Sequence, residues 1–299
     1  MGFEMNVMLL WRVLIVSAAL MMPLTLKATE FGASLETAQW HLDPSPLECR
    51  LWQQVPDYGE VVFLHQSGQN LQFYVESERA AISTGEAEIK VIAPLWKTGI
   101  RDKSIATVKL AKGNRPLTLD DKWANWFLDE LYEGMNPAIV LSGWHNHKKL
   151  RVDVSPVNFQ DAYAGYLSCV AGLFPSNFEK LRHSTLNFRT DKWRIRGKLL
   201  KRLDLLARYI ELDAEVEHIY VDGYADNEGR RGHNWELSRL RARAVQRYLE
   251  HSGVDPSMIT MRYHGETRPL VRNSNKSNRA KNRRVFVQLV KTEAWNQKT

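Results

Sequence analysis

The chain has 299 residues, of which 44% are hydrophobic and 25% charged, so it is long enough for two domains with cores of their own and too apolar for wholesale disorder. Its net charge of +7 is unevenly spread, because residues 1–174 carry 15 Lys and Arg against 19 Asp and Glu, whereas residues 175–299 carry 26 against 15. A basic second half of this kind attracts an acidic polymer, an anionic lipid surface or nucleic acid.

The N-terminus has the pattern of an export signal. Arg12 precedes an uncharged run at residues 13–26, which is shorter than the roughly 20 residues needed to span a bilayer but suits the apolar core of a signal peptide. We expect cleavage at Ala28, and an uncleaved membrane anchor is the alternative. No cysteine lies near this point, so no lipid anchor is expected. Export also argues against nucleic acid as the partner of the basic half.

Short strands dominate the acidic half. Residues 71–75 (Leu-Gln-Phe-Tyr-Val) have the pattern of a half-buried strand, and the loop at residues 67–70 predicts a hairpin with the preceding run. Strands are expected at residues 48–55, 60–64, 71–75, 88–92, 104–110, 138–141 and 150–154.

Two helices interrupt these strands. Thr118 with Asp121 predicts a capping-box-like start for the first helix, which ends at Gly134. The Ser-Pro pair at residues 155–156 predicts the start of the second. Many sequential strands with few helices predict a mostly antiparallel, barrel-like or sandwich-like β domain over residues 29–174.

The two cysteines of the chain, Cys49 and Cys169, both lie in the acidic half. An exported chain with two cysteines normally oxidises them to each other, which predicts a disulfide between the start of the first domain and its last helix. Closing so long a loop stabilises a fold by roughly 4–5 kcal/mol. Two free buried thiols are the alternative.

A seam at residues 174–177 (Phe-Pro-Ser-Asn) is expected to divide the chain into a signal at 1–28, a first domain at 29–174 and a second at 175–299. The second domain is expected to contain a strand at residues 184–188, an amphipathic helix at 196–212, a strand at 217–222, a helix at 234–251 and two further strands. This β-α-β-α-β-β order predicts an α/β sandwich with helices on one face, and the whole chain is placed in the α+β class.

A candidate site follows the strand at residues 217–222. Asp226 lies at the carboxyl end of this strand, where open α/β sheets bind ligands, and Arg241 lies about two turns into the next helix. An exposed loop carboxylate and such an arginine suit a zwitterion, because the carboxylate takes an ammonium group and the guanidinium forks onto a carboxylate. An ordinary surface salt bridge without a ligand is the alternative.

Four short motifs of the second half, in their order and spacing, resemble the OmpA-like peptidoglycan-binding domain. They are Gly-Tyr-Ala-Asp at 223–226, Leu-Ser-Arg-Leu-Arg-Ala at 237–242, Gly-Glu-Thr-Arg-Pro at 265–269 and Asn-Arg-Arg-Val at 282–285. The resemblance implies that Asp226 and Arg241 bind the diaminopimelate of peptidoglycan stem peptides, and that Asn234 and Arg284 belong to the same groove.

Two positions depart from the pattern of that family. Ala225 stands where a Thr or Ser is usual, so one hydroxyl contact is missing. Asn278 stands where a Gly is usual before Arg279, and asparagine tolerates the left-handed backbone that such a turn needs. Neither change removes a charged ligand group.

The N-terminal half is similar to another family. The string at residues 40–58, with Leu-Glu-Cys-Arg-Leu at 47–51 and Val-Pro-Asp-Tyr-Gly-Glu at 55–60, resembles the MotY family of periplasmic proteins of sodium-driven polar flagellar motors. The resemblance implies a ring formed with MotX around the flagellar basal body, docking of the first domain to the basal body and the PomA/PomB stator, and a grip on peptidoglycan by the second. A general envelope protein that tethers the envelope to peptidoglycan, unconnected to flagella, is the alternative.

Other constellations point to no catalytic centre, metal site or cofactor. His145 and His147 offer two imidazoles, but no acidic partner is close in sequence, so a polar loop is expected there. The chain contains no Gly-x-Ser-x-Gly, His-Glu-x-x-His or Walker motif, so no enzyme activity is expected. Most of the ten tryptophans fall at helical or strand spacing, which favours core packing over stacking on sugars.

Overall fold

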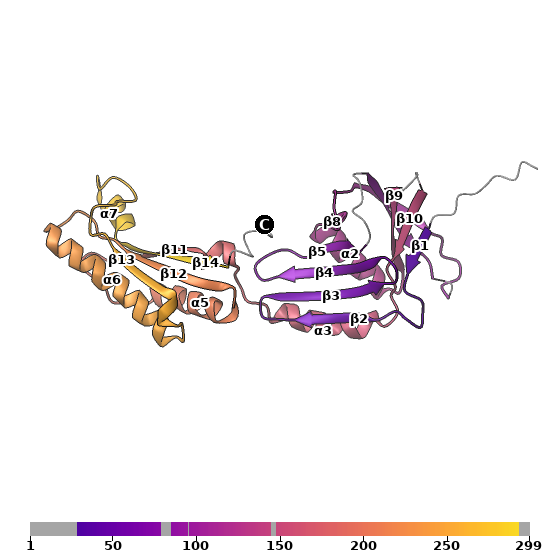
Figure 1. The fold of residues 1–299 in the computed structure, drawn as a ribbon, viewed down its shortest axis with the longest axis horizontal. Helices are drawn as coiled ribbons and strands as arrows, with labels where there is room; N and C mark the ends of the chain where they lie inside the picture. The colour runs from indigo at the N-terminus through magenta and orange to yellow at the C-terminus, as the bar shows by residue number, and fades with distance from the viewer. Residues whose placement is uncertain (1–28, 79–84, 95, 145–147, 293–299) are drawn as a thin grey trace, which may run out of the picture.

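The protein forms two lobes that lie end to end along its longest axis (Figure 1). The computed structural model describes residues 29–78, 85–94, 96–144 and 148–292. The N-terminal lobe runs from β1 (Thr29–Gly32) to α3 (Phe159–Ala171), and the C-terminal lobe from α4 (Phe178–Leu181) to β14 (Arg284–Lys291). The expected signal peptide and the His145-Asn146-His147 run lie outside the described residues. Within the described ranges, no helix is long and apolar enough to cross a membrane.

Two five-stranded sheets build the N-terminal lobe. One has the order β1, β10 (Lys148–Asp153), β9 (Asn136–Trp144), β6 (Glu86–Ile92) and β7 (Lys103–Lys109). The other has the order β2 (Trp40–Pro44), β3 (Glu48–Val55), β4 (Gly59–Gln66), β5 (Gln72–Ser77) and β8 (Leu117–Leu119). The described pairings are antiparallel except that of β1 with β10. The prediction of a mostly antiparallel β domain, including the β4–β5 hairpin, is therefore confirmed.

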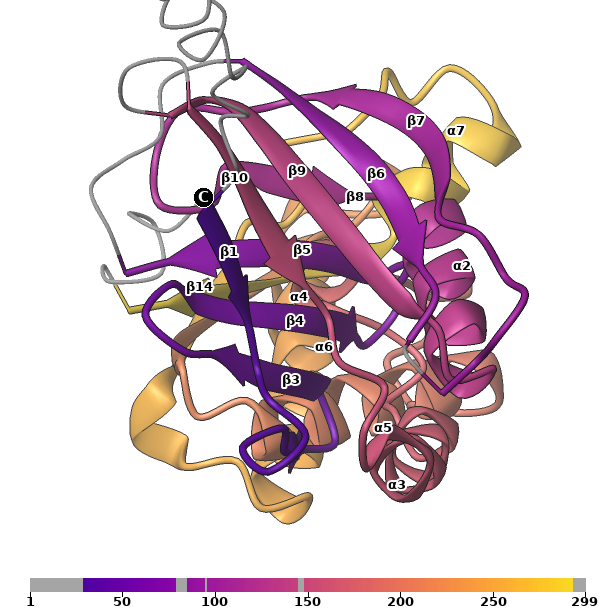
Figure 2. The ribbon, with the colours of Figure 1, turned by 90° about the vertical axis from the view of Figure 1, so that its right-hand side faces the viewer.

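One hydrophobic core joins the two sheets of this lobe. Along β3 the residues alternate between buried and partly exposed, as the period of a strand with one buried face requires. Phe63 of β4 packs on Phe73 of β5 with ring centroids 4.9 Å apart, and Phe73 packs edge-on against Phe127 at 4.6 Å. Phe127 belongs to α2 (Asp121–Tyr132), so this row of rings fixes the helix on the sheet. Figure 2 shows α2 and α3 along one side of the lobe.

Both helices of the N-terminal lobe start later than the sequence predicts. Thr118 is part of β8, and the residue that caps α2 is Asp120, whose side chain accepts a hydrogen bond from the Trp123 N–H. The backbone of Ser155 is held in the core instead of starting α3, because its N–H donates to Gln53 at 2.9 Å and its carbonyl accepts from Trp40 at 2.9 Å. Buried backbone groups need such partners, so the helix does not start here; a turn at residues 157–158, with Asn158 in the left-handed region, leads into Phe159.

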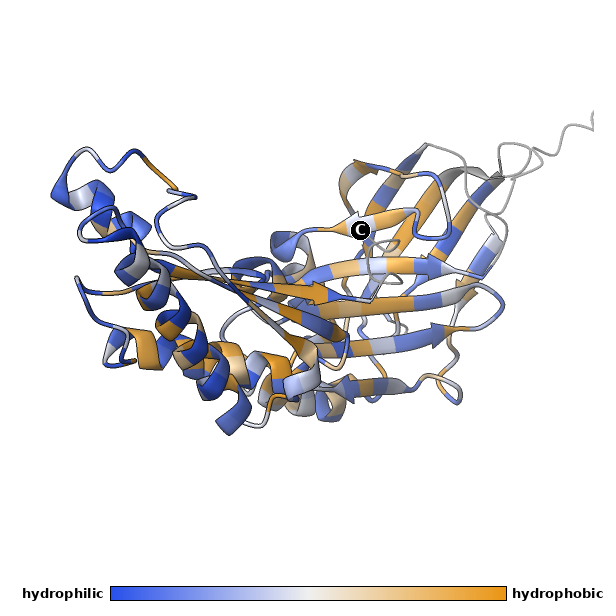
Figure 3. Ribbon diagram, turned by 60° about the vertical axis from the view of Figure 1, so that its left-hand side comes forward, coloured by the Kyte–Doolittle hydropathy of each residue, from blue (hydrophilic) through white to orange (hydrophobic). Residues whose placement is uncertain are grey.

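The C-terminal lobe has the predicted β-α-β-α-β-β order with two short additional helices. Its sheet has the order β11 (His183–Asn187), β14, β12 (Val216–Gly223) and β13 (Ile259–Tyr263), with β12 and β13 parallel and β14 antiparallel to both of its neighbours. The long helices α5 (Lys198–Leu212) and α6 (Arg231–His251) cover one face of the sheet (Figure 3). A 3-10 turn at Pro256–Met258 leads into β13, and α7 (Lys276–Asn282) precedes β14.

The close approach of α6 to the sheet depends on Gly223 at the end of β12. A Cβ atom at this position would lie 2.2 Å from the carbonyl oxygen of Ser238 and 3.0 Å from the Cβ of Ala242. Only glycine therefore lets the helix reach the strand here. The helix begins at Arg231, three residues before the expected start, so Asn234 lies within its first turns rather than at its beginning.

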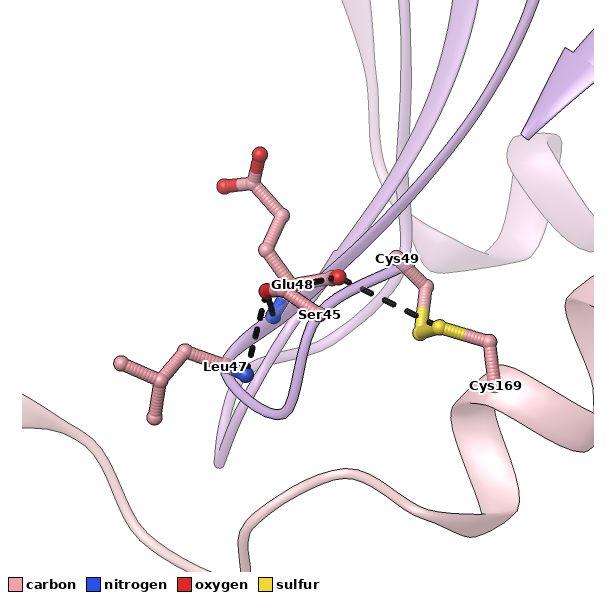
Figure 4. The surroundings of a disulfide bond; sticks show 5 residues. All are labelled: Ser45, Leu47, Glu48, Cys49 and Cys169. Atoms are coloured by element: carbon pink, nitrogen blue, oxygen red, sulfur yellow. Dashed lines mark hydrogen bonds between the residues drawn. A yellow bond between two sulfur atoms is a disulfide. The ribbon is translucent and has the colours of Figure 1, made fainter. Parts of the chain in front are cut away.

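The two lobes meet at a small seam beside a disulfide. The Phe174 N–H donates to the carbonyl of Pro46 at 2.8 Å, and the Lys180 ammonium donates to the carbonyl of Gly68 at 3.0 Å. The predicted disulfide is present: Cys49 of β3 is bonded to Cys169 of α3, with Cα atoms 6.0 Å apart (Figure 4). It therefore fastens the end of α3, from which the chain leaves for the C-terminal lobe, to the start of β3, next to the loop whose Pro46 carbonyl accepts from Phe174.

Candidate functional site

The predicted site residues gather at the free end of the C-terminal lobe. Figure 1 shows α7 at the end of the molecule opposite β1, β9 and β10. At this end β12 finishes at Gly223, α6 begins at Arg231, and α7 passes into β14 at Arg283. The pairing of β12 with β13 and β14 brings these segments together although they are far apart in sequence.

Asp226 lies in the loop between β12 and α6, but its side chain is not exposed. The residue is 4% exposed, and its Oδ2 accepts a hydrogen bond of 2.8 Å from Arg283. Its Oδ1 accepts the Glu228 N–H at 3.3 Å. The expectation of an exposed carboxylate is wrong, because Arg283 from the α7–β14 junction pairs with Asp226 and both side chains are buried.

Arg241 is fully buried on the inner face of α6. Its guanidinium donates to the backbone carbonyls of Lys192 at 2.9 Å, Tyr224 at 3.0 Å and Arg189 at 3.2 Å. Burial lowers the pKa of Arg241 to about 10, and the charge of Asp226 acts in the opposite direction. Arg241 thus stays protonated at neutral pH and keeps a positive charge beside the Asp226 carboxylate.

Asn234 carries an unpaired polar atom at the same place. The residue is 1% exposed, and its Nδ2 donates to the Glu266 carboxylate at 2.5 Å. Its Oδ1 is buried and has no hydrogen-bond partner in the part of the chain that the structure describes. A buried acceptor left unpaired costs stability, and a donor from a bound molecule would recover that cost.

The two consecutive arginines of the Asn-Arg-Arg-Val motif point to different sides of the sheet. Arg283 reaches Asp226 on the side of α6, whereas Arg284 lies over the ring of Tyr224 at 3.7 Å from its centroid. The resemblance to the family pointed to Arg284 for the groove and did not single out Arg283. The period of two along β14 could have found it, because Arg283 shares the parity of the core residues Val285 and Val287.

The two residues that depart from the family pattern, Ala225 and Asn278, both lie in regular surroundings. Ala225 is buried, and its N–H donates to the carbonyl of Gly265 at 2.8 Å. Asn278 lies inside α7, where its N–H donates to the side chain of Asn275 at 2.9 Å, and its backbone is not left-handed. The expected left-handed turn at Asn278 is therefore wrong.

Two tryptophans beside the site are exposed, in contrast to the expectation of core packing. Trp193 in the β11–α5 loop is 40% exposed, and Trp235 in the first turns of α6 is 49% exposed. Trp235 packs edge-on against Tyr263 of β13 with ring centroids 4.8 Å apart. Trp40, in contrast, is buried in the N-terminal core as expected.

The site contains the buried carboxylate of Asp226, the buried guanidinium of Arg241 and the buried oxygen of Asn234, which has no hydrogen-bond partner among the described residues. The carboxylate of Asp226 and the free oxygen of Asn234 suit an ammonium group, and the guanidinium of Arg241 suits a carboxylate. Among the described residues there is no group of three or more His, Cys, Asp or Glu side chains that could hold a metal ion. These groups are chemically complementary to a zwitterion.

Comparisons with known proteins match both halves of the chain. Residues 31–175 match the family of the MotY N-terminal domain, and residues 187–283 match the OmpA family. The chain is 26% identical over 267 residues to the sodium-type flagellar protein MotY of Vibrio parahaemolyticus, covering 88% of this chain and 91% of that protein.

Other similarities involve the C-terminal lobe. The peptidoglycan-associated lipoprotein of Haemophilus influenzae is 33% identical over 106 residues, which is 36% of this chain and 69% of that protein. Among solved structures, the C-terminal domain of Helicobacter pylori MotB aligns with 38% of this chain and 90% of that domain, at 26% identity and a TM-score of 0.35. With a MotY N-terminal domain followed by a domain of the OmpA family, and with similarity to a MotY protein along most of its length, the chain belongs to the MotY family.

Proposed function

We propose that the C-terminal lobe binds peptidoglycan by holding the zwitterionic end of diaminopimelate at Asp226, Arg241 and Asn234. The observation that carries the proposal is the unpaired Oδ1 of Asn234, which is buried on α6 about two turns before Arg241, the arginine whose charge acts on Asp226. The relatives of this lobe include peptidoglycan-associated lipoproteins, whose name states an association with peptidoglycan.

In this proposal the ligand exchanges bonds with groups that the protein already pairs internally. The ligand ammonium competes with Arg283 for Asp226 and donates to the Asn234 oxygen, which gains a partner. The ligand carboxylate takes the place of the Arg189 and Lys192 carbonyls on Arg241, so binding moves the loop between β11 and α5. Exchanging bonds in this way makes specificity high, because a ligand without both charges leaves a buried group unpaired.

We further propose a non-enzymatic role in the periplasm as a flagellar motor component that anchors stator units to the cell wall. Membership in the MotY family and the similarity to a sodium-type flagellar protein support this role. The wall-binding end would point away from the N-terminal lobe (Figure 1), leaving that lobe to dock on the basal body, MotX and the PomA/PomB stator in a ring. A stator that generates torque needs a fixed support, and the covalent wall provides one.

The full chain after signal removal is expected to sediment with purified sacculi, and free meso-diaminopimelate is expected to release it. The reason is that the free amino acid offers the same ammonium and carboxylate as the wall. The measurement is the fraction of protein in the pellet as the competitor concentration is raised, with lysine as a control that has the same two ammonium groups but only one carboxylate. Protein that stays in the supernatant without competitor would contradict the proposal.

A general tether between envelope and wall is the second candidate, because the OmpA-family match alone would support it. The two roles differ in what a deletion strain does. The flagellar role predicts cells that carry normal filaments and do not swim, whereas a general tether predicts swimming cells with a leaky envelope. Tracking of swimming cells together with release of periplasmic enzymes separates these outcomes.

A further inference from the structure

The segment from the last residue of β11 to the first two residues of α5, residues 187–199, is strongly basic, and its cations are not neutralised by nearby carboxylates. We call it the basic loop. Its one acidic residue, Asp191, pairs with His233 at 2.7 Å. Within the described chain, none of its cationic side chains pairs with a carboxylate; these are Arg189, Lys192, Arg194, Arg196 and Lys198.

The basic loop surrounds a hollow of ligand size with an aromatic wall. The hollow has a volume of about 910 Å³ and is lined by the basic loop itself, including Phe188 and the exposed ring of Trp193. Volumes of this size are typical of sites for small molecules or segments of a polymer. Cations around an exposed indole thus form a surface that attracts anions and offers one flat apolar face.

Trp193 connects this hollow to a second basic groove. The groove has a volume of about 300 Å³ and runs along α6, where Arg239, Arg243 and Arg247 line it together with Trp193. Arg239 pairs with Glu236 at 2.6 Å, whereas no described carboxylate pairs with Arg243 or Arg247. Seven uncompensated cations therefore surround Trp193 on two elements.

This surface is continuous with the proposed diaminopimelate site. The carbonyls of Arg189 and Lys192, which belong to the basic loop, are the acceptors for two of the bonds of Arg241. A ligand carboxylate at Arg241 therefore takes the place of backbone carbonyls of the basic loop, and the next part of the same polymer meets the side chains of that loop.

The chemistry of the surface selects among possible anions. Peptidoglycan repeats carboxylates along its stem peptides and sugar rings along its glycan. The carboxylates match the cations of this surface, and a sugar ring matches the exposed indole of Trp193. The cores of protein interfaces are depleted of charged residues, whereas this surface carries seven cations without a carboxylate partner among the described residues. Single-stranded nucleic acid uses stacked aromatic side chains along a basic groove, whereas Trp193 is the one tryptophan that lines these two hollows.

We propose that the basic loop, with Trp193, and Arg243 and Arg247 of α6 form a second subsite for peptidoglycan. This subsite binds stem-peptide carboxylates and stacks one sugar face on Trp193, next to the diaminopimelate held at Asp226. This subsite rests on the proposed function of the lobe. It adds affinity that depends on salt, because exposed charge pairs are screened by ions, while the buried cluster supplies specificity.

The test compares charge removal on this surface with equal charge removal elsewhere. The variant R194Q/R196Q/K198Q removes three cations of the basic loop, and K109Q/K112Q/K122Q removes three exposed cations of the N-terminal lobe. W193A is matched by W96A, since Trp96 is also exposed but lies in the N-terminal lobe. Sedimentation of each full-length variant with sacculi is measured over a range of salt, after circular dichroism has confirmed the same thermal midpoint as wild type.

The basic-loop variant is expected to bind sacculi about tenfold more weakly at low salt and to lose much of the salt dependence. W193A is expected to weaken binding by about threefold, and both N-terminal controls are expected to match wild type. Blocking the wall carboxylates with carbodiimide and glycinamide should remove the difference between wild type and the basic-loop variant.

Other outcomes separate the two proposals. If wild type binds and D226N does not, but the basic-loop variant binds as its control does, the second subsite is wrong and the proposed function stands. If wild type does not bind sacculi, both the proposed function and the second subsite are wrong. If the basic-loop variant keeps its affinity for sacculi but loses binding to a fluorescent oligonucleotide, the surface belongs to a nucleic-acid site and the proposal is overturned.

Discussion

Replacing Asp226 by asparagine is expected to lower the affinity for sacculi by at least about thirtyfold, while replacing Arg283 by glutamine leaves the affinity equal to or higher than that of wild type. Asp226 is the partner of the ligand ammonium in our proposal, and Arg283 competes with that ammonium. Arg241 stays in R283Q, and its positive charge remains close enough to act on Asp226. The measurement is the fraction of each variant that sediments with sacculi over a range of protein concentration.

The pair of variants also controls for stability. Asp226 and Arg283 are both nearly buried, with side chains 6% and 10% exposed, so each single change leaves one charge without its partner. Both variants are therefore expected to lose about 3 kcal/mol in the free energy of unfolding, measured by urea denaturation. Equal losses of stability with opposite effects on binding would assign Asp226 to the ligand. Equal losses of binding in both variants would show that the ion pair only holds the fold.

A change at Arg241 is a poorer probe, although its sequence position predicted the same role. Its guanidinium satisfies three backbone carbonyls from two separate loops. Truncation to alanine would leave these carbonyls unpaired within the lobe, and the fold would lose stability whether or not a ligand binds there. Asp226 is the better residue to test, because its partner Arg283 can be removed in a separate variant.

The elements of the C-terminal lobe could be predicted from the sequence because their signals are local. The β-branched run that ends at Gly223 predicted β12, and leucine spacing predicted α5 within two residues of its observed start. Helix starts in the N-terminal lobe were misplaced where a competing bond came from far away. Ser155, for example, is fixed by Gln53, which lies 102 residues earlier in the chain.

The composition of the candidate site could be predicted, but not its state of burial. The motifs located Asp226, Arg241 and Asn234 at one end of the lobe, where the structure also places them. That the Asp226 carboxylate is paired depends on Arg283, 57 residues away, and on which of two adjacent arginines faces α6. The exposure of Trp193 depends on a loop that has no helical or strand period, so its position in the sequence carried no information about packing.

Loss of the disulfide is expected to be the largest single change in stability. Cys49→Ser removes the bond between two residues 120 positions apart, and for a loop of this length the entropy gained by the unfolded chain corresponds to roughly 5 kcal/mol. The residue is also fully buried at the start of β3, next to the loop whose Pro46 carbonyl receives the Phe174 N–H at the seam between the lobes. The measurement is the urea midpoint of wild type and variant, with a lower periplasmic level of the variant expected in cells.

The wild-type protein itself provides the matched control for this prediction. Reduced wild type should unfold at the same urea concentration as C49S/C169S, because both lack the crosslink and differ only in two atoms. C169S alone should be as unstable as C49S, since each single change breaks the same bond. Oxidised and reduced wild type with equal midpoints would show that the fold does not depend on the crosslink. Labelling of two free thiols in denatured, unreduced protein from the periplasm would show that it does not form in the cell.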